Sequence, residues 1–257
     1  MMQHQPAAAS VVEPILEVQQ VSRRFGNFQA LTDISVSFLP GQLTAIIGPN
    51  GAGKSTFFNV VSGALAPSTG RIRFQGRDIT GMAPHQYARI GIAKSFQITN
   101  VFRQLSAHEN VRVAVQMRSS RFAILRSRAH MTAQIEQADA LLARVGLTAS
   151  RDKAAGDLAH GQQRALEVAM ALAAEPVLLL MDEPTAGMSP EETGVMMHLI
   201  SSLAQQRTVI LVEHKMKLVM NLCQRLIVLH HGALLADGSP EAIRANDDVR
   251  RVYLGKN

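Results

Sequence analysis

Two patterns of hydrophobic and polar positions divide the chain. Near its start, Leu16–Val21 and Ile34–Phe38 alternate apolar and polar residues, which predicts half-buried antiparallel strands. From Val177 onward, short apolar runs of strand length are interleaved with segments of helical period. Strands that alternate with helices predict a mostly parallel α/β sheet covered on both faces, and the opening strands predict a small accessory antiparallel sheet beside it.

The elements of this alternation can be placed individually. Leu43–Ile47 is a short apolar run that is followed by a glycine-rich loop. A helix is expected to begin where this loop ends, at Lys54–Ser62. Pro67 and Gly70 mark a turn before the next strand. The other expected strands are Gly70–Phe74, Val177–Met181, Thr208–Val212 and Leu226–Leu229, the other expected helices are Glu191–Leu203, Lys215–Leu222 and Pro240–Ala245, and a hairpin is expected at Gly232 and Ala233–Gly238.

The middle of the chain has a different character. From Ser106 to Leu147 the pattern is helical, with little glycine and no proline, and one helical face carries Ala138, Leu141, Leu142 and Val145. This segment predicts a helical insertion rather than a separate domain. We therefore expect a flexible tail at 1–14 and one domain at 15–257, with a helical subdomain at about 98–172.

Composition narrows the environment of the protein. The net charge of +6 fits nucleic-acid binding, proximity to an anionic membrane face, or a mildly basic protein without either partner. Aromatic residues make up 4% of the chain and tryptophan is absent, which argues against a stacking platform for single-stranded nucleic acid. A single cysteine fits a reducing compartment, and no apolar run approaches the roughly 18 residues that span a bilayer. We therefore expect no nucleic-acid partner, and any membrane role must come through another protein.

A phosphate-binding motif lies between the expected strand and helix. It reads Gly48-Pro49-Asn50-Gly51-Ala52-Gly53-Lys54-Ser55, which fits G-x-x-x-x-G-K-[ST]. Glycines allow backbone N–H groups to curl around phosphate oxygens, and the following helix directs its positive end at the same anion. We expect Lys54 to reach the β- and γ-phosphates of ATP, Ser55 to ligate Mg²⁺, and Thr56 to add a hydroxyl near the α-phosphate. A glycine-rich turn with an incidental lysine would not explain the position of the motif between a strand and a helix.

An acidic pair ends a later apolar strand. Val177–Met181 is followed by Asp182 and Glu183. In a parallel sheet these acids would lie at the carboxyl edge beside the phosphate loop. There Asp182 would support Mg²⁺ and Glu183 would polarise the water that attacks the γ-phosphate. The alternative is two solvated acids at a strand end, which the upstream loop makes much less attractive.

Further motifs between and after these two carry a resemblance to a known family. The segment Leu158-Ala159-His160-Gly161-Gln162-Gln163-Arg164 resembles the L-S-G-G-Q signature of ATP-binding-cassette (ABC) ATPases, and the resemblance extends from Leu16 to Leu254. In that family two subunits sandwich ATP, and the signature of one closes over the γ-phosphate held by the other. The resemblance implies that Ala159, Gly161 and Gln162 contact a partner's ATP. It also implies that Phe25 stacks on adenine, that Gln97 senses Mg²⁺ and takes part in catalysis, and that His214 is the switch histidine at the γ-phosphate.

Three positions depart from the family pattern. Ala159 replaces the usual serine, so one hydroxyl contact is missing, and His160 replaces a glycine, so its ring needs room or a partner. Ser189 stands where the D-loop usually has Asp or Asn, which puts that cross-dimer contact in doubt. None of these departures removes Lys54 or Glu183.

Other stretches are similar to one group within the family, the ATPases of branched-chain (hydrophobic) amino-acid importers. The similar segments are Asp78–Gly81, Gly91–Gln97, Ala159–Arg164, Thr185–Pro190 and Val252–Gly255. Such importers imply integral-membrane permease subunits, a second ABC ATPase that is identical or not, and a periplasmic solute-binding protein as an indirect partner. The implied location is the cytoplasmic face of the inner membrane, with residues 98–105 facing the permease and Phe102 as its anchor.

Other function classes remain open on the sequence alone. An ABC ATPase that serves no transporter would usually add a zinc-binding cysteine set, a long coiled coil or a second cassette, and none is visible here. An exporter or envelope-lipid cassette subunit would share every catalytic motif. A partner that binds ATP but hydrolyses it slowly is opposed by the intact Glu183 and His214, whereas Ala159 and Ser189 leave this alternative open.

Overall fold

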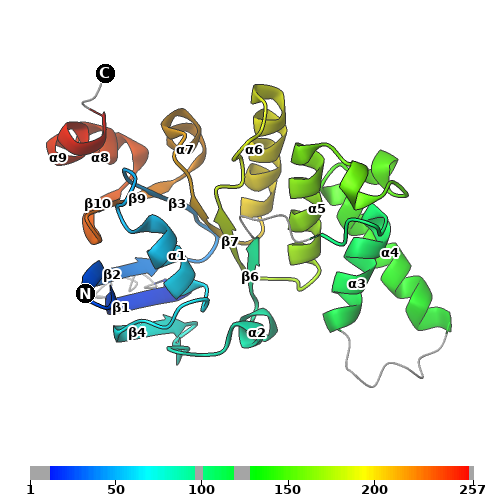
Figure 1. Ribbon diagram of the computed structural model, residues 1–257, viewed down its shortest axis with the longest axis horizontal. Coiled ribbons are helices and arrows are strands. Elements are labelled where there is room, and N and C mark those ends of the chain that lie inside the picture. The colour runs from blue at the N-terminus through cyan, green and yellow to red at the C-terminus, as the bar shows by residue number, and fades with distance from the viewer. Residues whose placement is uncertain (1–11, 96–100, 119–127, 255–257) are drawn as a thin grey trace, which may run out of the picture.

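A mostly parallel sheet forms the centre of the computed structural model, which describes residues 12–95, 101–118 and 128–254 (Figure 1). In this part of the chain the sheet has six strands in the order β10-β9-β3-β8-β7-β6, and only β10 runs antiparallel to its neighbour. A second sheet of four strands, β2-β1-β4-β5, is antiparallel. The strands are β1 Leu16–Phe25, β2 Phe28–Phe38, β3 Leu43–Ile47, β4 Thr69–Phe74, β5 Arg77–Asp78, β6 Ile92–Ser95, β7 Leu178–Asp182, β8 Thr208–Val212, β9 Arg225–His230 and β10 Ala233–Gly238.

Helices cover the main sheet and extend beyond its β6 edge. The helix α1 lies between the main and the accessory sheets, whereas α3, α4 and α5 gather past β6, at the right of Figure 1. The helices are α1 Lys54–Val61, α2 Pro84–Tyr87, α3 Ala107–Arg118, α4 Arg128–Arg144, α5 His160–Leu172, α6 Pro190–Ala204, α7 Met216–Leu222, α8 Pro240–Ala245 and α9 Asp247–Val249.

Strand alternation divides the interior into two apolar cores. Successive side chains of a strand point to opposite faces, so Leu179 and Met181 of β7 join a core with α3 to α7, whereas Leu178 and Leu180 join a core with α1 and the accessory sheet. All five residues of β3, β7 and β8 are buried. Burial on both faces explains why these strands read as continuous apolar runs in the sequence.

The expected elements are largely confirmed. The strands Leu43–Ile47 and Thr208–Val212 and the helix Pro240–Ala245 have the predicted bounds, and the final hairpin forms from β9 and β10. The helical stretch from Ser106 to Leu147 contains α3 and α4, and the segment that joins them, 119–127, lies outside the described residues. The sequence patterns did not predict β6 or α2. The boundaries proposed for the tail and the helical subdomain stay predictions.

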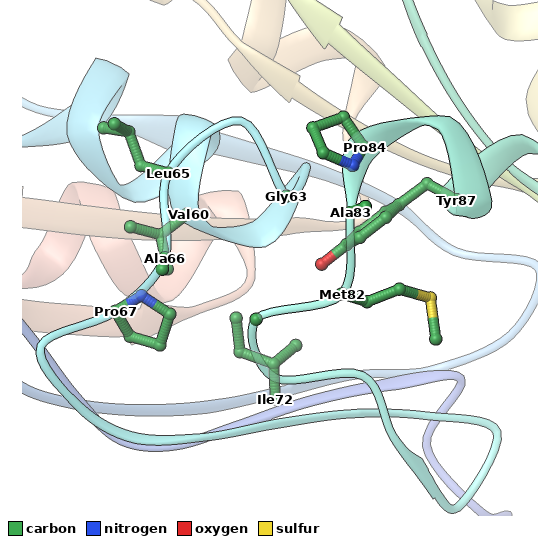
Figure 2. A pocket seen from close by; sticks show the side chains of 11 residues that line it. Val60, Gly63, Leu65, Ala66, Pro67, Ile72, Met82, Ala83, Pro84 and Tyr87 are labelled. Atoms are coloured by element: carbon green, nitrogen blue, oxygen red, sulfur yellow. The ribbon is translucent and has the colours of Figure 1, made fainter.

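A small pocket of about 120 Å³ lies beside the accessory sheet (Figure 2). Its lining comes from the end of α1, the turn after it, β4 and α2, and the hydroxyl of Tyr87 points into it. Tyr87 is buried, and burial raises the pKa of its phenol to about 12. No residue of the phosphate-binding motif lines this pocket, because the motif opens α1 and the pocket lies at the other end of that helix.

Candidate active site

The carboxyl ends of three neighbouring strands bring the predicted catalytic segments together. In the main sheet β8 lies between β3 and β7, and Val212 is in register with both Ile46 and Asp182. The Glu183 amide donates a hydrogen bond to the Val212 carbonyl at 2.9 Å. The phosphate loop, the acidic pair and His214 therefore leave the sheet at one edge, where ligands of parallel α/β sheets bind.

Glycine is required by the shape of the loop that follows β3. A Cβ on Gly48 would lie 2.2 Å from the carbonyl oxygen of Leu229, and Gly53 has a left-handed φ of 95°. Gly53 is also the N-cap of α1 and supplies no side-chain acceptor for the first amides of that helix. These free N–H groups and the positive end of α1 form the cradle that a phosphate group requires.

Lys54 closes the loop on itself. Its Nζ donates to the carbonyl oxygens of Gly48 at 2.8 Å and Pro49 at 3.0 Å. Burial lowers the pKa of the Lys54 ammonium, and the nearby carboxylates of Glu183 and Asp182 oppose that shift. The ammonium thus lies within electrostatic reach of the two acids, and its predicted contact with the phosphates of ATP stays a prediction.

Asp182 and Glu183 occupy different environments although they are adjacent. Asp182 is only 5% exposed, and burial raises the pKa of its carboxyl, an effect that Lys94 opposes and Glu183 reinforces. Glu183 is half-buried and has a φ of 44°, a backbone conformation that non-glycine residues rarely adopt. Strain of this kind persists only where the surrounding structure imposes it, and it concentrates at functional sites.

His214 lies beside the second acid. Its Nδ1 is 3.8 Å from Oε1 of Glu183, and its side chain is 51% exposed. A histidine and a carboxylate at this spacing, at the edge that holds the phosphate cradle, can act together on a water molecule and on a terminal phosphate. This arrangement places the two predicted catalytic side chains next to each other.

An exposed aromatic residue lies at the turn of the accessory hairpin. Phe25 ends β1, is 43% exposed, and has the guanidinium of Arg23 over its ring at 4.6 Å from the centroid. Gly53 packs against Ala30 and Leu31 of β2, so this hairpin borders the phosphate loop. Phe25 is therefore available for stacking on a base. Its partner across the strands is Phe28, which is exposed as well.

The segment Leu158–Arg164, which resembles the family signature, contains the start of α5 and contacts α6. The N-cap of α5 is Ala159, whose amide donates to Oε1 of Gln162 at 3.2 Å. The Gly161 amide donates to Oε1 of Glu192 at 3.0 Å. Ala159, Gly161 and Gln162 are thus held at a helix start beside α6, and their contact with a nucleotide of a second subunit stays a prediction.

The departures from the family pattern have local explanations. The Nε2 of His160 lies 3.1 Å from the carbonyl oxygen of Ala186, which gives the ring the partner it required. Ser189 is the N-cap of α6: its hydroxyl accepts from the Glu192 amide at 3.2 Å, and Oε2 of Glu192 accepts from the Ser189 amide at 3.0 Å. This reciprocal capping box, followed by Pro190, explains why a serine suits this position.

One predicted residue cannot be placed. Gln97 lies outside the described residues, so its assignment to the metal site and to catalysis stays a prediction. The sequence interpretation also missed two residues. Lys94 extends from β6 with its Nζ 2.8 Å from Oδ1 of Asn59, and Glu213 is fully buried before His214. An acid at the end of an apolar strand was the signal that identified Asp182, and the same signal could have identified Glu213.

Two oxygen donors at the site suit a hard cation such as Mg²⁺. A serine hydroxyl and a carboxylate, from Ser55 and Asp182, are the oxygen donors that Mg²⁺ prefers. Within residues 12–95, 101–118 and 128–254, no group of three or more His, Cys, Asp or Glu side chains could hold a metal ion.

Sequence comparisons identify the family. The family described as ABC transporter matches residues 31–186, and the family described as branched-chain amino acid ATP-binding cassette transporter matches residues 233–257. The high-affinity branched-chain amino acid transport ATP-binding protein BraF of Pseudomonas aeruginosa is 40% identical over 251 residues, covering 95% of this chain and 98% of the relative. The protein LivG of Escherichia coli, which has the same description, is 38% identical over 252 residues, covering 95% and 99%.

Solved structures agree with the sequence comparisons. A nucleotide-free ATP-binding cassette from an ABC transporter has a TM-score of 0.81 at 28% identity, covering 95% of this chain and 100% of that structure. The ADP conformation of an ATP-binding cassette of an ABC transporter has the same TM-score, identity and coverage. In the described part of the chain, no helix is long and apolar enough to cross a membrane. The chain belongs to the ABC transporter family as one of its nucleotide-binding cassettes, and the ATPase activity general to that family is its activity.

Proposed function

We propose that this cassette is the ATP-hydrolysing subunit of an importer for branched-chain amino acids or related small solutes. The observation that carries the ATPase assignment is the convergence of the phosphate loop, Glu183 and His214 at one edge of the sheet. The importer assignment is supported by relatives at 38–40% identity over 95% of this chain, whose names specify branched-chain amino acid transport.

Two cassettes sandwich two ATP molecules in this proposal. The phosphate loop, residues Asn50 to Thr56, binds the phosphates through its amides and Lys54, and Phe25 stacks on the adenine ring. The partner cassette contributes its α5 start, so that Ala159, Gly161 and Gln162 of each chain contact the γ-phosphate held by the other. The Gly161 amide is bound to Glu192 of α6, and α5 lies apart from α1, the helix that follows the phosphate loop (Figure 1); both observations support this division of labour.

Hydrolysis uses the residues at the strand ends. Glu183 orients and polarises the attacking water, and His214, whose Nδ1 lies 3.8 Å from Oε1 of Glu183, braces the γ-phosphate. Ser55 and Asp182 would hold Mg²⁺, with Gln97 beside them, and the cation supplies charge neutralisation at the phosphates when bound. Opening and closing of the dimer would then drive the permease between its two access states.

The proposed partners follow from the importer role. They are integral-membrane permease subunits, a second ABC ATPase, and indirectly a periplasmic solute-binding protein, with the cassette peripheral on the cytoplasmic face of the inner membrane. Phe102 is our candidate anchor for the permease, and its side chain is 54% exposed. A large apolar side chain exposed to this extent is the kind of residue that a partner covers.

The test is affinity purification of the tagged chain from gently solubilised membranes of its host, followed by mass spectrometry. We expect permeases and a second cassette ATPase, and we expect Phe102→Ala to reduce their recovery. Phe28→Ala is the matched control, because Phe28 is a similarly exposed phenylalanine on the accessory hairpin. Recovery of ribosomal or DNA-repair proteins without a permease would overturn the importer role, and recovery of exporter or lipid-transport subunits would replace it.

A further inference from the structure

A fully buried acid lies between β8 and the exposed ring of His214. Glu213 has 0% of its surface exposed, although it directly precedes the predicted switch histidine. An ionised side chain is rarely buried without partners that compensate for its lost hydration. The role of Glu213 therefore depends on what binds its two oxygens.

Four donors converge on this carboxylate. Oε1 accepts from the Thr185 hydroxyl at 2.5 Å and from the Thr185 amide at 3.3 Å. Oε2 accepts from the His214 amide at 3.0 Å and from the Lys215 amide at 3.4 Å. One side chain thus joins the backbone that carries His214 to the segment that follows Glu183 by two residues.

A lysine reinforces the same junction from the other side. The Nζ of Lys215 donates to the Thr185 carbonyl at 3.0 Å and to the Thr193 hydroxyl of α6 at 3.2 Å. Thr185 is itself fully buried. The next residue, Ala186, meets the His160 ring of the signature helix. The cluster of Glu213, Thr185 and Lys215, of which the first two are fully buried, therefore connects the histidine, the catalytic acid and the start of α5.

We propose that Glu213 is a positioning residue for ATP hydrolysis. By binding Thr185 and the His214 amide at once, its carboxylate fixes the spacing between Glu183 and His214. This inference rests on the proposed roles of Glu183 and His214, and it identifies Glu213 as the residue that keeps these two side chains at a fixed spacing. It accounts for an acid at this position, because a carboxylate accepts all four hydrogen bonds, whereas an amide or a hydroxyl would bring a donor against other donors.

The Thr185 hydroxyl gives the cleanest test. Thr185→Val keeps the shape of the side chain but removes the hydrogen bond to Glu213, whereas Thr185→Ser keeps the hydroxyl. In the full-length chain we expect Thr185→Val to lower kcat for ATP about tenfold, since small displacements of reacting groups cost up to about 10²-fold. KM for ATP should stay within about twofold, because the phosphate cradle is untouched. Thr185→Ser should rescue most of the lost turnover.

Repeating Thr185→Val in a His214→Ala variant distinguishes a positioning role of Glu213 from a purely structural one. In His214→Ala, the side chain through which Glu213 acts is gone, so Thr185→Val should cause little further loss of kcat. Glu213→Gln provides the same comparison from the other partner if Thr185→Val folds poorly, which its melting temperature would show. An equal loss of kcat in both backgrounds, or a rise in KM with kcat intact, would overturn the inference.

Failure of the proposed function gives a different result. If His214→Ala and Glu183→Gln both leave turnover unchanged, the assigned active site is wrong and the positioning role falls with it. If both are impaired while Thr185→Val retains normal turnover, only the role of Glu213 is wrong.

Discussion

The first backbone amides of α1 and of α5 differ in whether side chains of the same chain accept their hydrogen bonds. At α1, Gly53 caps the helix without any side-chain acceptor, which leaves its first amides for a ligand. At α5, the Gly161 amide is already bound by Glu192, and the Ala159 amide by Gln162. The first helix start leaves its amides open for a nucleotide, whereas at the second two amides are already bound by side chains of the same chain.

The largest effect should come from the catalytic edge beside α1. Glu183→Gln removes the carboxylate that polarises water, so we expect ATP turnover to fall by about 10²–10⁴-fold while ATP still binds. Steady-state phosphate release and equilibrium binding of ATP measure the two quantities. Glu136→Gln, at an exposed acid of α4, is the matched control and should leave turnover unchanged. Unchanged turnover in Glu183→Gln would remove the proposed catalytic role.

Nucleotide affinity tests the contribution of the accessory hairpin to the open site. Phe25→Ala should raise the Kd for ATP by about 5- to 10-fold, because a stacked aromatic ring contributes roughly 1 kcal/mol or more. Titration of a fluorescent ATP analogue measures this change. Phe28→Ala controls for loss of an exposed aromatic residue from the same hairpin. Equal losses in both variants would indicate a general effect on the hairpin instead of stacking by Phe25.

A hydroxyl introduced at the N-cap of α5 should stabilise the start of this helix. Ala159→Ser supplies an N-cap oxygen for the Gln162 amide and completes a capping box, because the Gln162 side chain already accepts from residue 159. We expect a stabilisation of about 1 kcal/mol, which corresponds to roughly 2–4 °C in Tm for a domain of this size. Thermal denaturation measures the shift. Ala140→Ser, exposed within α4, should not raise Tm, and a similar rise there would contradict the capping explanation.

The smallest effect should be the pH dependence of Tm that comes from the Glu192 carboxylate, which binds the Gly161 amide at the start of α5. Amide hydrogen bonds from Ser189 and Gly161 lower the pKa of Glu192 from its ordinary value of 4.5. Ionised Glu192 thus stabilises the fold above that pH, and the contribution is lost as pH falls through the folded-state pKa. Glu192→Gln should flatten the decline of Tm below pH 4.5, and Glu136→Gln should not. Parallel declines in Glu192→Gln and the unmodified chain would contradict this linkage.

Local signals accounted for much of the site. The phosphate loop could be predicted because glycine, lysine and serine must follow one another there, and because an apolar strand and a helix frame them. The acid pair could be predicted because Asp182 and Glu183 end a run that only a buried strand explains. Family resemblance supplied His214, and the structure places it 3.8 Å from Glu183.

Contacts between distant segments could not be predicted in the same way. Glu192 and Gly161 are 31 residues apart, and Glu213 and Thr185 are 28 apart, so no periodicity reports either bond. The strand β6 was missed because Lys94 and Ser95 are polar, and Ser95 is buried only through the packing of the sheet. The left-handed backbone of Glu183 is likewise imposed by neighbouring strands and not by its own residue type.

The sequence by itself determined the order of most strands and helices, the phosphate loop and the acids at the end of β7, because these follow from short-range periodicity and from the steric needs of glycine. Only the tertiary structure decided that Glu213 is buried with four donors and that Glu192 closes the start of α5. The reason is that burial and long-range hydrogen bonds depend on which segments the fold brings together, and a linear pattern does not contain that information.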